Sequence, residues 1–82
     1  MSINAYVLIE VEPGKVKELI GKVAGIKGIK SSCAVTGPYD IIAEVEAENI
    51  EQLGEVISNQ IQDFPGVHKT ITCLCTMCLP IK

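Results

Sequence analysis

The chain has 82 residues, a net charge of −3 and no arginine among its seven basic residues. This length, with 48% hydrophobic and 21% charged residues, predicts one globular domain covering residues 1–82. An acidic chain without arginine is a poor match for nucleic-acid phosphates or anionic membranes, so we expect direct binding to neither. The chain also shows no signal-peptide pattern and no uncharged run long enough to span a bilayer, which predicts a cytoplasmic protein.

The first strand and helix are predicted from a change in hydrophobic period. Residues 5–11 alternate between two faces, which indicates a strand. Pro13 and Gly14 end this strand, and Pro13 suits the first turn of a helix. That helix is predicted from apolar residues at the spacing of one helical face, namely Val16, Leu19, Ile20 and Val23.

Two further strands flank a turn in the middle of the chain. Residues 29–36 alternate again, which predicts a face made of Ile29, Ser31, Cys33 and Val35. Residues 37–40, Gly-Pro-Tyr-Asp, are typical of a turn. Residues 41–45 are short and apolar, as expected of a central strand.

The rest of the chain predicts a second helix and a final strand. Asn49 followed by Gln52 resembles a capping box at a helix start. The buried stripe of this helix is predicted to be Ile50, Leu53, Val56, Ile57, Ile61 and Phe64. Pro65 and Gly66 end it, and the Thr-rich residues 67 to about 78 predict a long strand.

The predicted order is strand–helix–strand–strand–helix–strand, and the two halves resemble each other. At one constant offset, Val16 matches Ile50, Leu19 matches Leu53 and Val23 matches Ile57. A duplicated βαβ unit predicts an α+β fold, the ferredoxin-like βαββαβ sandwich with a four-stranded antiparallel sheet. Right-handed crossovers place both helices on one face, with the first and third strands central.

The opposite face of this sheet has no element left to cover it. Tyr6 and Leu8 are predicted to point there, joined from the final strand by Thr70, Thr72, Leu74 and Thr76. Such a mixed apolar face is large for a domain of this size to leave in water. We therefore expect sheet-on-sheet pairing of two copies, in the manner of dimeric α/β barrels.

Three segments resemble the RAM domain, the effector-binding half of the Lrp/AsnC transcription regulators. Residues 5–11 resemble the family's first strand. Residues 35–45, with Gly37 and Asp40, resemble its G-x-x-D hairpin. Residues 64–72 resemble the segment after its second helix. The resemblance extends from about residue 3 to residue 82.

The sequence shows no helix-turn-helix domain, so it looks like the stand-alone RAM proteins, for which DNA binding is not implied. In that family, dimers pair through their sheets, assemble into rings such as octamers and bind amino acids between dimers. The resemblance therefore implies a homodimer, a higher ring and an amino-acid ligand. It also allows a full-length Lrp/AsnC regulator as a partner.

The hairpin residues Gly37, Pro38, Tyr39 and Asp40 are the first candidates for ligand contact, because the family's hairpin lines the effector pocket. Asp40 can pair with an amino acid's ammonium group, and a glycine loop can offer backbone amides to its carboxylate. Tyr39 can form a wall of the pocket. The alternative is a purely structural turn, in which glycine supplies the backbone conformation and Asp40 caps locally.

Thr70 and Thr72 are the second candidates. They share one face of the final strand, so both hydroxyls can point into one pocket, and the resemblance places them near the effector. The alternative is that they are there only because Thr favours strands.

The cysteines Cys33, Cys73, Cys75 and Cys78 suggest an alternative function as a metal-binding ferredoxin-like module. Alternation along a strand puts Cys73 and Cys75 on one face and Cys78 on the other, so the three do not converge. We therefore expect cytoplasmic thiols, with no metal and no cofactor.

A small enzyme on a dimeric barrel is the third hypothesis, and its acid or base would be His68 or Asp40. Neither residue has an evident activating neighbour, so we expect no enzymatic activity.

Overall fold

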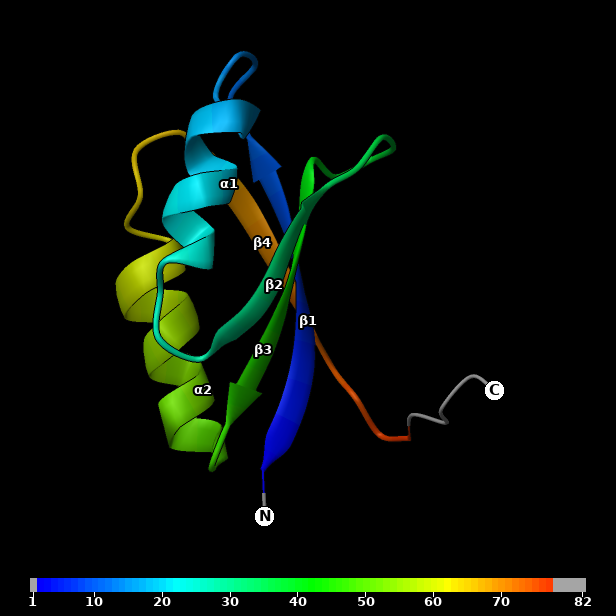
Figure 1. The fold of residues 1–82 in the computed structure, drawn as a ribbon, viewed down its shortest axis with the longest axis vertical. Coiled ribbons are helices and arrows are strands. Elements are labelled where there is room, and N and C mark those ends of the chain that lie inside the picture. The colour runs from blue at the N-terminus through cyan, green and yellow to red at the C-terminus, as the bar shows by residue number, and fades with distance from the viewer. Residues whose placement is uncertain (1, 78–82) are drawn as a thin grey trace.

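The computed structural model describes residues 2–77, and its elements follow the predicted order (Figure 1). The strands are β1 (Ile3–Val11), β2 (Ile29–Ala34), β3 (Ile41–Ala47) and β4 (Val67–Leu74). The helices are α1 (Val16–Ala24) and α2 (Ile50–Val56), and α2 runs directly into the π-helical turn η1 (Ile57–Ile61). Within residues 2–77, no helix is long and apolar enough to cross a membrane.

The strands form one antiparallel sheet in the order β2-β3-β1-β4, which confirms that the first and third strands are central. Helix α1 and the α2–η1 segment lie on the same face of this sheet (Figure 1). This is the ferredoxin-like βαββαβ sandwich expected from the repeated βαβ pattern.

The core lies between this sheet face and the helices. Every second residue of β1 and β3, from Ala5 to Val11 and from Ile41 to Ala47, is buried. The helical side of the core is made of Leu19, Val23, Leu53, Val56, Ile57 and Ile61. Burying a side chain of this size stabilises a fold by about 1.5–3 kcal/mol, so the two central strands and these helix faces supply most of the hydrophobic stabilisation.

The helix starts differ in detail from the prediction. Helix α1 begins at Val16, after a turn that contains Pro13 and Gly14, so Pro13 is not in its first turn. At α2 the predicted cap is confirmed, because the Asn49 side chain accepts a 2.8 Å hydrogen bond from the Gln52 N–H. The Gln52 side chain bonds to the Glu48 N–H, one residue earlier than a standard capping box has it.

The buried face predicted for the second helix is wrong at its first residue. Ile50, the first residue of α2, is 56% exposed, whereas Leu53, Val56, Ile57 and Ile61 are buried as predicted. Gln62 N donates a 3.0 Å hydrogen bond to the Ile57 carbonyl, five residues back, which is the spacing of a π-turn. This wider turn keeps both Ile57 and Ile61 on the buried side.

The face assigned to the final strand was wrong. Strand β4 pairs with β1 so that Ile71 lies opposite Leu8 and Cys73 opposite Tyr6. Thr70 and Thr72 therefore lie on the helix side of the sheet, and the same alternation places Leu74 there. The error arose because β4 carries β-branched residues on both faces, so its composition does not reveal which face is inward.

The face predicted for the second strand was wrong for one residue. Strand β2 bulges at Lys30, so that Ile29 pairs with Val45 while Ser31 pairs with Glu44. Ile29 consequently packs against the core, whereas Ser31 and Cys33 lie on the opposite face. A β-bulge adds one residue to one strand and thereby reverses the alternation beyond it.

We call the sheet face opposite the helices the open sheet face. Its apolar centre consists of Tyr6, Leu8, Cys33, Ile42, Ile71 and Cys73. Tyr6 and Ile71 are 38% and 37% exposed, and no described element covers them. Glu10 lies opposite Lys69 near one end of this face, so charged residues border the apolar centre.

Candidate ligand-binding end

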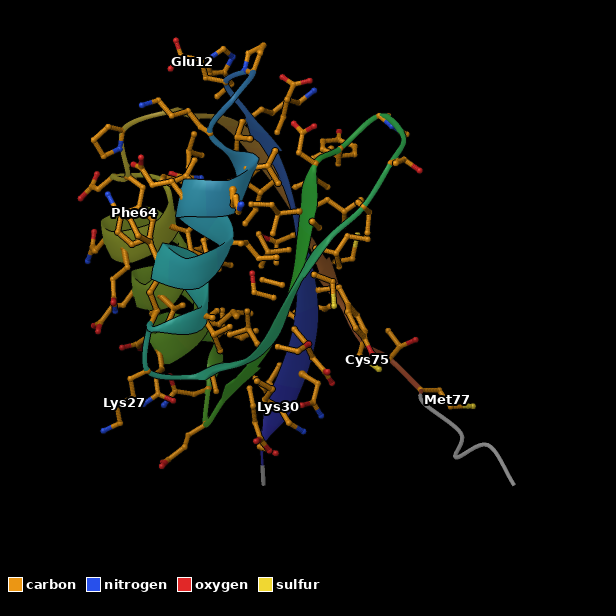
Figure 2. All side chains as sticks on the ribbon, turned by 45° about the horizontal axis from the view of Figure 1, so that its top comes forward. Glu12, Lys27, Lys30, Phe64, Cys75 and Met77 are labelled. Atoms are coloured by element: carbon orange, nitrogen blue, oxygen red, sulfur yellow. The ribbon has the colours of Figure 1, made fainter. Side chains whose placement is uncertain are left out.

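Three connections meet at one end of the molecule, the upper end in Figure 1. They are the β1–α1 turn, the hairpin between β2 and β3, and the segment between η1 and β4. Glu12 lies at this end, and Lys27 lies at the opposite one (Figure 2). Of the candidate hairpin residues, Asp40 is bonded to the end of β1, whereas the hairpin projects away from the other two connections (Figure 1).

Asp40 connects the hairpin to strand β1. Its N–H donates to the carbonyl of Ile9 at 3.0 Å, and its carbonyl accepts from the N–H of Val35 at 2.9 Å. Its carboxylate Oδ2 accepts a part-buried hydrogen bond of 2.9 Å from the N–H of Val11. The Asp40 carboxylate thus caps a backbone group on β1 that is distant in sequence, and not one within its own turn.

The hairpin tip is the segment 36–39. Gly37 has a φ of +139°, a conformation that favours glycine, and Gly37 and Pro38 are exposed. Tyr39 is half-buried. Among residues 2–77, nothing accepts a hydrogen bond from the backbone N–H of Gly37 or Tyr39. The tip therefore holds two backbone N–H groups without an acceptor among the described residues, beside a half-buried aromatic ring.

The segment before β4 is fixed against the other side of the β1 terminus. Glu12 N donates a 2.7 Å hydrogen bond to the Gly66 carbonyl. Gly66 has a φ of +98°, and a Cβ there would contact Leu19 and Lys15 at 3.4 Å. The end of β1 is thus held by the hairpin on one side and by this segment on the other.

Thr70 and Thr72 are not brought together with the hairpin. Thr70 lies opposite Ile9 across β1, and its hydroxyl accepts a 2.8 Å hydrogen bond from the Gln62 side-chain amide. A pocket of about 310 Å³ beside it is lined by Gln62, Val67, His68, Lys69 and Thr70, with no hairpin residue. Thr72 is exposed on the same side of β4. Within one chain, the two groups of candidates form separate sites.

The sequence did not indicate a larger pocket at the opposite end of the molecule. Its volume is about 530 Å³, and its lining includes Ser2, Lys27, Glu46, Glu48, Gln52, Glu55 and Gln60. Most of these polar side chains are exposed, and Ser2 Oγ donates a 2.8 Å hydrogen bond to Glu46. Helical periodicity marks only the buried side of α2, so it gives no signal for a groove on its polar side. Gln62 was missed for the same reason.

The cysteines depart from the expectation that all are thiols. Cys33 and Cys73 are free and exposed on the open sheet face. Cys75 is disulfide-bonded, and Cys78 lies outside the described residues. Within residues 2–77, His, Cys, Asp and Glu side chains form no group of three that could hold a metal ion.

Residues 4–77 match the Lrp/AsnC ligand binding domain family. An uncharacterized HTH-type transcriptional regulator of Pyrococcus furiosus is 32% identical over 72 residues, which cover 84% of this chain and 48% of the relative. The chain thus spans about half the length of the curated relatives it matches.

Solved structures share the fold over nearly the whole chain. TTHA0845 from Thermus thermophilus is 33% identical, with a TM-score of 0.89 over 96% of this chain and 99% of that one. The transcriptional regulator NMB0573 from Neisseria meningitidis, solved as an L-Met complex, is 12% identical with a TM-score of 0.86. That match covers 96% of this chain and 53% of the regulator, and at this identity it shows the fold alone. The family match and the shared fold together show that this chain belongs to the Lrp/AsnC ligand binding, or RAM, domain family, whose members are regulatory.

Proposed function

We propose that the chain is an amino-acid-sensing and self-assembling module that regulates transcription, and that it is not an enzyme. The observation that carries the proposal is the family match over residues 4–77, combined with a hairpin tip at which the N–H groups of Gly37 and Tyr39 have no acceptor among the described residues. Membership of a family of regulators argues for a regulatory role over an enzymatic one. The role would place the chain in the cytoplasm beside DNA-bound regulators.

The ligand would bind at the hairpin tip. The N–H groups of Gly37 and Tyr39, on either side of Pro38, would each donate a hydrogen bond to its carboxylate. Pro38 would fix the tip between them, and the ring of Tyr39 would contact the ligand side chain. L-methionine, present in the Neisseria regulator of the same fold, is the natural first probe.

A second copy of the chain would complete the assembly. The open sheet face has an apolar centre with a charged border, and pairing two such faces would remove both centres from water. Because Thr70 and Thr72 are separated from the hairpin within one chain, they would contribute to the ligand site only across a contact between subunits. Such contacts between dimers would also build a ring, for example an octamer.

Regulation would pass through a full-length Lrp/AsnC partner that carries a DNA-binding domain. The chain matches about half of each such regulator, and that half contains the ligand-binding fold. A mixed assembly of this chain with the regulator would thus share the same sheet-to-sheet pairing, without direct contact between this chain and DNA.

The test is a thermal-shift panel of the twenty amino acids together with light scattering, using protein purified without a reductant so that the Cys75 disulfide is kept. A ligand at 100 times its Kd stabilises a fold by about 2.7 kcal/mol, which raises the Tm of a domain this small by about 10–20 °C. We expect at least one amino acid to do so, and an assembly no smaller than a dimer. A monomer indifferent to all twenty would refute the proposal.

Two variants locate the site. Tyr39→Ala should weaken the binding of the amino acid that gives the largest shift, whereas Gln60→Ala, in the pocket at the opposite end, should leave it unchanged. The reverse result would move the site from the hairpin to that pocket.

A further inference from the structure

We infer that Asp40 is a positioning residue, which holds the hairpin tip on β1 through a hydrogen bond and does not need its negative charge for ligand binding. Only the part of this inference that concerns ligand binding rests on the proposed function. The simplest interpretation of a carboxylate in a ligand-binding hairpin is that it serves as the counter-ion for the ligand's ammonium group. The inference assigns Asp40 a different role.

The first step is the point at which the β1–β3 pairing stops. The last paired residues are Ile9 and Ile41, and β1 continues to Val11 without a partner strand on this side. Backbone groups of residues 9 and 11 point to the same edge, because alternate residues of a strand share an edge. A longer hairpin strand would have supplied a partner for the Val11 N–H.

The second step is that Asp40 alone replaces that missing strand. Its N–H bonds to the Ile9 carbonyl, and its carboxylate accepts from the Val11 N–H. One residue thereby satisfies both edge groups, one with its backbone and one with its side chain. The Val11 N–H is part-buried, so losing this acceptor would leave a donor without a partner.

The third step concerns the tip. Segment 36–39 lies in the connection between β2 and β3 and is not part of the sheet. Among the described residues, the backbone bonds that close and anchor the hairpin beyond the ladder are the Val35–Asp40 and Asp40–Ile9 pair. Asp40 therefore holds the base of the segment that carries the Gly37 and Tyr39 N–H groups.

The fourth step separates the hydrogen bond from the charge. The bond to Val11 needs an oxygen acceptor at Oδ2, and an asparagine side chain offers an oxygen of the same geometry without the charge. Asp40→Asn therefore keeps the anchor, whereas Asp40→Ala removes it. A counter-ion for an ammonium group would be lost in both variants.

The experiment compares Asp40→Asn, Asp40→Ala and the control Glu12→Gln, which removes an equal charge at the same end of the molecule from a side chain that forms no hydrogen bond with the described residues. Amide hydrogen exchange at Val11, followed by NMR in the free protein, reports the anchor. Titration with L-methionine, or with the amino acid that gives the largest thermal shift, reports binding.

We expect Asp40→Asn and Glu12→Gln to keep Val11 protection and ligand affinity within about threefold of the starting chain. Asp40→Ala should lose about tenfold or more in both, and the NMR signals of Gly37 and Tyr39 should shift with it. If Asp40→Asn keeps Val11 protected but binds as weakly as Asp40→Ala, the charge contacts the ligand and the inference is wrong. Unchanged Val11 exchange in Asp40→Ala would also overturn it.

The exchange measurement needs no ligand. If no amino acid binds the starting chain, the proposed function fails, and Val11 exchange still decides whether Asp40 anchors the hairpin. If Asp40→Ala fails to fold, loss of Val11 protection in Asp40→Asn would by itself refute the inference.

Discussion

Tyr6 on β1 lies directly opposite Cys73 on β4, and both side chains are on the open sheet face. The next pair along these strands, Val7 and Thr72, points to the other face of the sheet, where the helices lie. This pairing makes the Cys73 thiol a reporter of whatever covers the open sheet face.

The first prediction uses that thiol. In a dimer formed by the open sheet faces, Cys33 and Cys73 should react with a thiol reagent more slowly as protein concentration rises through the dimer Kd. Ellman's reagent measures the rates, and Cys73→Ser assigns them. Rates independent of concentration, in a sample that light scattering shows to be dimeric, would place the contact elsewhere.

The second prediction concerns the centre of the open sheet face. Leu8→Lys should weaken self-association by about tenfold or more, because burying an unpaired charge is costly. The fold itself should persist, since Leu8 is not in the core. Thr72→Lys is the matched control, because Thr72 is exposed on the other side of the sheet. Equal effects of the two variants in sedimentation equilibrium would argue against sheet-to-sheet pairing.

The third prediction concerns Gln62 and Thr70. The 2.8 Å bond between their side chains is exposed, so Gln62→Ala and Thr70→Val should each destabilise the fold by only about 0.5–1 kcal/mol. In urea unfolding, the double variant should cost less than the two single changes added together, because the residues share one interaction. Full additivity would show that the contact contributes nothing in solution.

The fourth prediction contrasts two glycines. Gly66→Ala should destabilise the fold by about 1–2 kcal/mol, because its φ of +98° disfavours a side chain, while the new Cβ would only contact Leu19 and Lys15 at 3.4 Å. Gly54→Ala should instead stabilise it by about 0.5–1 kcal/mol, since Gly54 lies in α2 with nothing within 4 Å of the added Cβ. Urea unfolding measures both. A stabilising Gly66→Ala would contradict the packing described here.

Much of the fold could be predicted, because its central elements have one clearly apolar face. The alternation of β1 and the helical spacing of Leu19 and Val23 are both realised in the buried core. The strand order then follows from the repeated βαβ unit and the handedness of its crossovers. Edge strands were less predictable: β2 bulges at Lys30, and β4 carries Thr and Ile on alternating faces.

The sequence by itself determined the element order, the core faces of the central strands and helices, and the family, because these depend on local periodicity and on short motifs. Only the tertiary structure decided which face of β4 is outward and that Thr70 contacts Gln62. It alone revealed that the Asp40 carboxylate bonds to Val11, 29 residues away in sequence. The physical reason is that strand register and long-range hydrogen bonds are fixed by the pairing of distant segments, which no local pattern encodes.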